Sequence, residues 1–196
     1  MNPVRPFIHI AVTALRHKVL TIFLIIASAL PIAAAAQPAD PLADAFARLA
    51  RPEGEGWRIA ESDILRAWSR SGSPAMDLLL QRGEAALDMG DIPSAIGHLT
   101  ALTDHAPDFA AGFQARAAAY AAAGQFGPAL ADLRQALILE PRHFAALTQL
   151  GLMLEEMGDD GRALAAYRAS LAIHPHQPEA IDGAARLERR RIGTDI

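Results

Sequence analysis

Residues 110–143 read AAGFQARAAAYAAAGQFGPALADLRQALILEPRH, and this stretch decides the fold because its pattern occurs three times. The same residue types recur every 34 positions between residues 76 and 177. The recurring positions are Gly83, Ala117 and Gly151; Gly90, Gly124 and Gly158; Ala95, Ala129 and Ala163; and Pro107, Pro141 and Pro175. Small and helix-ending residues at fixed offsets predict three copies of one structural unit.

Each unit carries the signals of two helices joined by a turn. The glycine at the phase of Gly90 can adopt the left-handed conformation that ends a helix. Asp91 is placed to cap the helix that follows, and Ser73 with Pro74 is placed to begin the first helix of the first unit. The proline at the phase of Pro107 then stops the second helix.

A period of 34 with this pattern resembles the tetratricopeptide repeat (TPR) family, in which each unit is a helix, a tight turn and a second antiparallel helix. The resemblance implies an all-α fold, a right-handed α-solenoid of helix pairs. It also implies that the residues at the phases of Gly83 and Ala95 let the two helices of a unit approach closely. Arg82 and Arg116 depart from the family pattern, which usually has leucine there.

Segments outside the repeats complete the expected organisation. Residues 1–36 read as an export signal with a basic leader, an apolar run over 19–30 and a small-residue cleavage site at 34–36. The expected divisions are a signal peptide over 1–36, an N-terminal helix pair and hinge over 37–73, TPR units over 74–109, 110–143 and 144–177, and a C-terminal capping helix and tail over 178–196.

The location expected from this leader is outside the cytoplasm. A cleaved signal would place the protein in the periplasm. The alternative is an uncleaved anchor in the inner membrane facing the periplasm, because residues 19–36 form an 18-residue apolar segment that is barely long enough to span a bilayer.

Composition excludes several classes of function. The chain has 18 basic and 22 acidic residues, and the first 36 contain three of the basic residues and no acid, so a mature chain has 15 against 22. This acidic balance argues against nucleic-acid binding. The absence of cysteine excludes disulfides, thiol catalysis and cysteine zinc sites.

The two flanking segments are predicted to cover the repeats. A helix from Pro41 to about residue 51 precedes a second helix in which Trp57, Ala60, Ile64 and Trp68 share one face. We expect the tryptophans to seal the exposed end of the repeat stack, and the alternative is an aromatic ligand platform.

At the other end, Pro178 opens a helix whose apolar face includes Ile181 and Leu187 and which should cap the last repeat. Its arginines, at 186 and 189–191, suit the negative end of the helix dipole, or alternatively an anionic docking partner.

No set of residues forms a recognisable catalytic or metal site. His105, His143, His174 and His176 lie near the turns that end repeats, but their spacing does not direct them at one ion and no third ligand is identifiable. Glu155, Glu156, Asp159 and Asp160 read as a solvated acidic turn. We therefore expect no enzyme activity, no cofactor and no metal.

The resemblance implies a concave groove formed by the first helix of each unit. The groove residues that the family pattern implies are Leu80, Glu84, Leu87, Gln114, Ala118, Ala121, Ala122, Thr148, Leu152 and Glu155. The lysine, arginine and asparagine clamp by which some family members hold a chaperone carboxylate is missing, since none of these residues is basic and the only asparagine is Asn2.

This groove predicts an adaptor that binds a protein or peptide segment, apolar and carrying positive charge. The protein would be a monomer or weak oligomer with no membrane contact beyond the signal segment. The alternatives are a self-associating structural tether and an enzyme with an unrecognised site.

Overall fold

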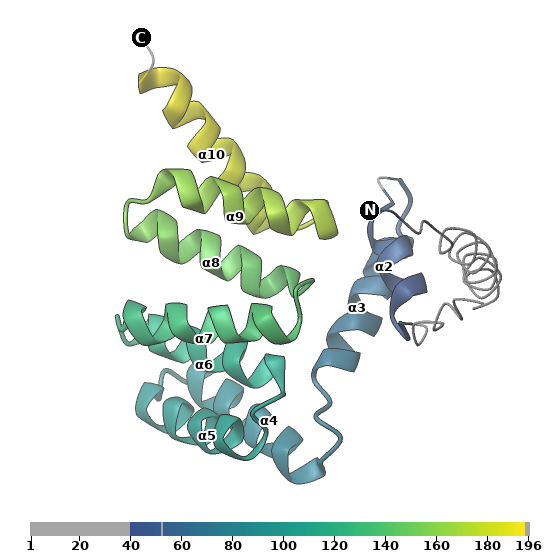
Figure 1. Ribbon diagram of the computed structural model, residues 1–196, viewed down its shortest axis with the longest axis vertical. Helices are drawn as coiled ribbons and strands as arrows, with labels where there is room; N and C mark the ends of the chain where they lie inside the picture. The colour runs from purple at the N-terminus through teal and green to yellow at the C-terminus, as the bar shows by residue number, and fades with distance from the viewer. Residues whose placement is uncertain (1–39, 52, 195–196) are drawn as a thin grey trace, which may run out of the picture. The chain divides into compact units, whose positions relative to one another are not determined.

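The computed structural model describes residues 40–51 and 53–194, and this part of the chain is all-α, as predicted (Figure 1). The expected signal peptide, residues 1–36, lies outside the described residues. The described helices are α2 (Ala43–Leu49), α3 (Gly56–Trp68), α4 (Pro74–Asp88), α5 (Ile92–His105), α6 (Ala110–Ala122), α7 (Phe126–Leu139), α8 (Phe144–Glu156), α9 (Asp160–Ile173) and α10 (Pro178–Thr194). None of them is long and apolar enough to cross a bilayer.

Three helix pairs, α4–α5, α6–α7 and α8–α9, stack in chain order and confirm the predicted repeats (Figure 1). The turn inside each pair is the same, because Gly90, Gly124 and Gly158 adopt φ values of 76°, 71° and 79°. In the first pair the amide of Asp91 donates to the carbonyl of Ala86 at 2.9 Å, the hydrogen bond expected after a left-handed glycine.

Of the two predicted helix N-caps, Asp91 and Ser73, only Asp91 makes a capping hydrogen bond. The Asp91 carboxylate accepts from the amide of Ser94 and caps α5, as predicted. Ser73 stands at the N-cap position of α4, but its side chain makes no capping hydrogen bond. The Ser71 hydroxyl and amide donate instead to Asp77 inside α4.

The small recurring residues allow close helix contact inside each pair. A Cβ atom added to Gly151 would lie 2.5 Å from Cε1 of Tyr167, which is closer than packed side chains allow. The alanines of the second helices, Ala95, Ala129 and Ala163, are completely buried. These positions are therefore packing sites, as the repeat pattern predicts.

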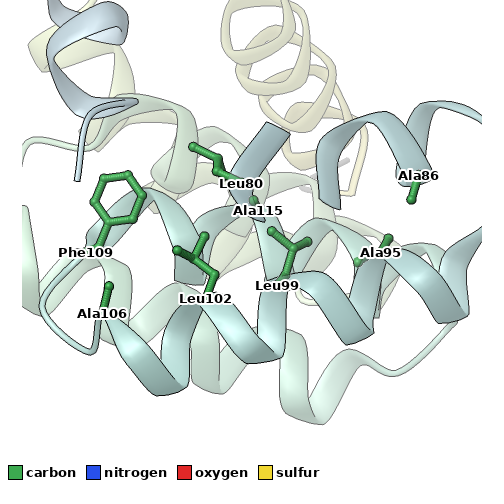
Figure 2. Close-up of a cluster of buried hydrophobic side chains, with 9 residues drawn as sticks. Leu80, Ala86, Ala95, Leu99, Leu102, Ala106, Phe109 and Ala115 are labelled. Carbon is green, nitrogen blue, oxygen red and sulfur yellow. The ribbon is translucent and has the colours of Figure 1, made fainter. Parts of the chain in front are cut away.

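Buried apolar side chains connect one pair to the next. Figure 2 shows the cluster in which Leu80 of α4 and Leu99 and Leu102 of α5 meet Phe109 and Ala115 at the start of the second repeat. Each repeat thus covers the apolar face of its neighbour, and the core extends along the stack.

Arg116, which replaces the usual leucine, forms a buried ion pair. Its guanidinium donates two hydrogen bonds to the carboxylate of Asp132, at 2.7 and 2.8 Å, and a third to the hydroxyl of Thr103. The two charges satisfy each other with good geometry, so the departure from the family pattern alters the local core without altering the fold.

The N-terminal helix pair does not seal the end of the repeat stack, so that expectation is wrong. Residues Ala45, Leu49, Ala60 and Ile64 bring α2 and α3 together, and this small core continues onto Phe144 of α8. Trp57 stacks on His176 and Trp68 stacks on His143, in the turns that follow α9 and α7. The pair is therefore attached at the second and third repeats, through these stacks and the contact with Phe144.

The C-terminal helix α10 covers the last repeat through Leu187, as predicted, but not through Ile181. Ala180, Ala184 and Leu187 are buried against α8 and α9, whereas Ile181, expected in this contact, is 44% exposed. Arg186 donates to both carboxylate oxygens of Glu155, at 2.7 and 2.8 Å. This arginine therefore fastens α10 to α8.

Candidate functional site

A cleft of about 670 Å³ lies between α3 and the first helices of the three repeats. One wall is α3, and the other is made by α4, α6 and the N-terminal end of α8. The lining residues are Arg58, Glu61, Ser62, Leu65, Arg66, Trp68 and Ser69 on the first wall, and Leu80, Glu84, Ala111, Gln114, His143 and Ala145 on the second.

The walls of this cleft carry apolar surface with small side chains opposite large ones. Leu65 and Trp68 on α3 line the same cleft as Ala111 and Ala145 on the repeats, and the buried Leu80 lies beneath them. Leu65 is 42% exposed although it belongs to a helix that is packed on its other face. An apolar side chain of a ligand could cover Leu65 and gain hydrophobic stabilisation there.

Most charges in the cleft already have partners. Arg66 donates to Asp63 at 3.4 Å and to the hydroxyl of Ser62 at 3.1 Å, and Arg58 lies 3.7 Å from Glu55. Glu84 differs, because no ion pair to it forms within residues 40–51 and 53–194. Desolvation in the cleft, followed by repulsion from Asp88, raises the pKa of Glu84 above its ordinary value.

A second, smaller cleft of about 160 Å³ shares Glu84 and Gln114 with the first. Its other lining residues are Leu87, Asp88, Leu99, Ala115 and Ala118. The two clefts together place the Glu84 and Asp88 carboxylates beside apolar and small residues of α4 and α6. A cationic group next to Glu84 would relieve the repulsion that these two acids exert on each other.

The structure brings five of the ten predicted groove residues to these clefts. Leu80, Glu84 and Gln114 line the larger cleft, and Glu84, Leu87, Gln114 and Ala118 line the smaller one. Ala122 and Leu152 are exposed but line neither cleft, and Ala121 packs into the core of the second repeat. Their role in binding stays a prediction.

Thr148 and Glu155 do not face an open groove, and their assignment to it is corrected here. The Thr148 hydroxyl donates to Gln177 at 2.8 Å and contacts the hydroxyl of Ser170, and all three side chains are buried. Glu155 accepts from Tyr167 and Arg186. The reason is that Ser170 of α9 and Gln177, just before α10, enclose Thr148, while Arg186 of α10 pairs with Glu155.

Apart from Trp68, which the alternative of an aromatic ligand platform included, the cleft residues on α3 were not predicted as site residues. The repeat pattern contains no information about a helix outside the repeats, so α3 could not be placed over the groove from periodicity. One signal in the sequence was that the turn after Pro141 differs in residue type from the turn after Pro107. Arg142 and His143 follow Pro141, whereas Asp108 and Phe109 follow Pro107 in the first repeat.

Comparison with known proteins gives relatives that carry the same repeat. No family model matches the chain. A TPR repeat-containing protein of Rhizobium etli is 27% identical over 161 residues, covering 82% of this chain and 79% of the relative. A heat-shock protein cognate co-chaperone of Aspergillus fumigatus is 28% identical over 120 residues, which cover 61% of this chain but only 35% of the co-chaperone.

Solved structures of TPR domains have a similar fold. The crystal structure of the Sgt2 TPR domain from Aspergillus fumigatus is 27% identical with a TM-score of 0.59, covering 63% of this chain and 83% of that domain. The first TPR domain of Spaghetti, bound to an HSP90 peptide, has a TM-score of 0.58 over 61% of this chain and 95% of that domain. At 22% identity, the second likeness concerns the fold alone. With its three helix pairs and these likenesses, the described chain has the fold of a tetratricopeptide repeat solenoid.

Proposed function

We propose that this protein is a non-catalytic TPR scaffold that binds a segment of another protein in the cleft between α3 and the first helices of the repeats. The observation that carries the proposal is the cleft itself, with apolar surface on both walls and a carboxylate, Glu84, that has no ion-pair partner in the described chain. The names of the related proteins support it, since the Spaghetti domain is bound to an HSP90 peptide.

The segment that fits this cleft is apolar and carries positive charge. Leu65 and Trp68 offer apolar contact, and Glu84 with Asp88 offers two carboxylates within one stretch of α4. A lysine or arginine of the partner would lower the cost of keeping Glu84 ionised. Glu155 does not add to this charge, because Arg186 already neutralises it.

The proposed place of action is the cell envelope, on the periplasmic side. The basis is the sequence of residues 1–36, with its basic leader, apolar run and small-residue ending. The mass of the protein recovered from the envelope tests this. A mature chain beginning near Gln37 supports the proposal, and a mass that retains residues 1–36 supports the membrane-anchored alternative.

Site-specific photo-crosslinking in cells tests the cleft. A photoreactive residue at Gln114, which lines both clefts, should capture one partner reproducibly. The matched control places the same residue at Arg134, which is exposed on α7 and lines neither cleft. Capture of the same protein from Arg134, or of none from Gln114, would contradict binding in the cleft.

A further inference from the structure

Each first helix after α4 packs on the preceding helix pair through one face. In α6 this face is made by Gly112, Arg116 and Ala119. A Cβ atom added to Gly112 would lie 3.1 Å from Leu102 of α5, and Arg116 donates to Thr103 of α5. The equivalent positions of α8 and α10 are also buried, and they include Ala146, Met153, Ala180 and Leu187.

The same face of α4 is open, because the helix pair α2–α3 is attached at the second and third repeats. Its residues, 34 positions before those of α6, are Leu78, Arg82 and Ala85, and Met89 at the C-cap continues the row. Leu78 is 44% exposed and Met89 is 78% exposed. Within residues 40–51 and 53–194 the guanidinium of Arg82 has no hydrogen bond or ion pair, whereas that of Arg116, at the same repeat position, has both.

The last helix, α10, has an open face of a different kind. Within a repeat, the second helix covers one side of the first, as where Gly151 of α8 lies against Tyr167 of α9. The residue of α10 equivalent to Gly151 is Ala185, and no second helix follows α10 in the described part of the chain. The row on this open face consists of Ile181, Ala185, Glu188 and Ile192. Its two isoleucines are 44% and 67% exposed.

The two open rows are complementary when their helices run antiparallel. Both rows have successive spacings of four, three and four residues, the spacing of a coiled-coil seam. Antiparallel is also the direction in which a second helix covers a first helix within each repeat. In this direction the rows pair Leu78 with Ile192, Arg82 with Glu188, Ala85 with Ala185 and Met89 with Ile181. Two of these pairs are apolar, one is small enough for close approach of the helices, and one joins opposite charges.

We propose that copies of this protein associate head to tail, with the open face of α4 in one copy packed antiparallel on the open face of α10 in the next. Glu188 accepts from Arg168 through Oε1 at 2.8 Å, and its side chain is 48% exposed, so its carboxylate can also receive Arg82. The two faces differ and lie at opposite ends of the stack, so copies can add at either end (Figure 1). None of the residues in the two rows lines either cleft, so the association goes beyond the proposed binding function and does not depend on it.

The contact between two copies is small, because each contributes one row of four residues. Association should therefore be weak and should increase with protein concentration. Sedimentation velocity of the protein purified from its own cells, over a concentration series, measures it. The mean sedimentation coefficient should rise steadily with concentration. A protein that sediments as a monomer throughout the series would overturn the proposal.

Charge reversal tests the pairing of Arg82 with Glu188. Arg82→Glu places two carboxylates opposite each other and Glu188→Arg places two guanidinium groups there, so each single variant should associate about tenfold more weakly than the parent. The variant with both substitutions restores opposite charges and should associate like the parent. The control is Arg134→Glu, which reverses an exposed charge on α7 away from both faces and should change nothing. If the double variant melts like the parent but associates no better than the single variants, the antiparallel register is wrong.

Cysteine cross-linking tests the same register without changing a charge. The chain contains no cysteine, so every disulfide formed under mild oxidation comes from the introduced residues. A mixture of the Ala85→Cys and Ala185→Cys variants should give a disulfide-linked dimer, because the register places these residues opposite each other. The control mixture pairs Ala185→Cys with Ala131→Cys, an exposed position on α7, and should give far less dimer. An equal yield from the control, or a dimer formed by Ala85→Cys alone, would overturn the head-to-tail contact.

Discussion

The indole ring of Trp68 stacks on the imidazole ring of His143 with centroids 4.4 Å apart and planes inclined by 23°. His143 is almost completely buried in this contact. Burial disfavours the charged imidazolium and lowers the pKa of His143 from 6.5 to about 4. The surrounding charges are Arg142 with its partners Asp40 and Glu140, and Arg66 and Glu61 across the cleft.

Docking of the helix pair should therefore weaken in acid. Because the pKa of His143 is lower in the folded state, its contribution is fully present above pH 6.5 and is lost as the pH falls toward 4. The loss is at most about 3.5 kcal/mol, since one pKa unit corresponds to about 1.4 kcal/mol. Tryptophan fluorescence measured against pH should show the change, and His143→Asn should flatten it. An equally steep profile in that variant would assign the titration to another group.

Gly151→Ala should destabilise the third repeat. The added methyl group would collide with the ring of Tyr167, and overpacking of this kind costs about 1–3 kcal/mol. The matched control is Gly97→Ala, a helical position with open space around it, which should gain about 0.5–1 kcal/mol. Chemical denaturation of both variants measures the difference. Equal stability of the two would mean that the helices of the third pair are not in close contact.

Leu187→Ala should weaken the attachment of α10. Leu187 is 2% exposed, and removing a buried leucine side chain costs about 2–5 kcal/mol. Ile181→Ala on the same helix should cost much less, because Ile181 is largely exposed. Thermal melts of the two variants would be compared with the parent. A larger loss from Ile181 would restore the face of α10 that the sequence pattern indicated.

Ala118→Arg should reduce partner binding while leaving the fold nearly unchanged. Ala118 lines the smaller cleft beside Glu84 and Asp88, so an arginine there would fill the space and pair with these acids in place of a cationic ligand. Ala131→Arg is the control, because Ala131 is exposed on α7 and lines neither cleft. Binding of a synthetic amphipathic peptide of leucine and lysine, measured at low and moderate salt, should fall for Ala118→Arg alone. If Ala118→Arg binds the peptide as tightly as the parent, the binding site does not include this part of α6.

The repeat fold was predictable because each unit repeats its own local signals. A left-handed glycine such as Gly124 and a buried alanine such as Ala129 act within one helix pair, and their spacing is visible in the sequence. The face of α10 was harder, because it depends on which side of the helix meets Tyr167. Gly183 lies against that ring, and a residue with a Cβ there would collide with it.

The site was less predictable than the fold because it depends on contacts between segments far apart in the chain. Glu84 and Gln114 were identified from repeat positions, which neighbouring units share. Thr148 occupies the position equivalent to Gln114 but bonds Gln177, just before α10, and Glu155 bonds Arg186 of α10. Trp68 reaches the cleft from outside the repeats. Periodicity describes neighbours along the stack and cannot describe a helix that returns to it.

The buried contact of Arg116 with Asp132 and Thr103 has a consequence for how the protein unfolds. Thr103 belongs to the first repeat, and Arg116 and Asp132 belong to the second, so this polar contact crosses the boundary between them. In a linear array, each boundary sets how readily a terminal unit peels away from its neighbour. Separation of the first repeat would remove one partner of Arg116 and admit water to an ion pair that is now largely shielded. The first two repeats should therefore unfold together as one cooperative block, with partial fraying suppressed at the end of the array nearest the cleft carboxylates.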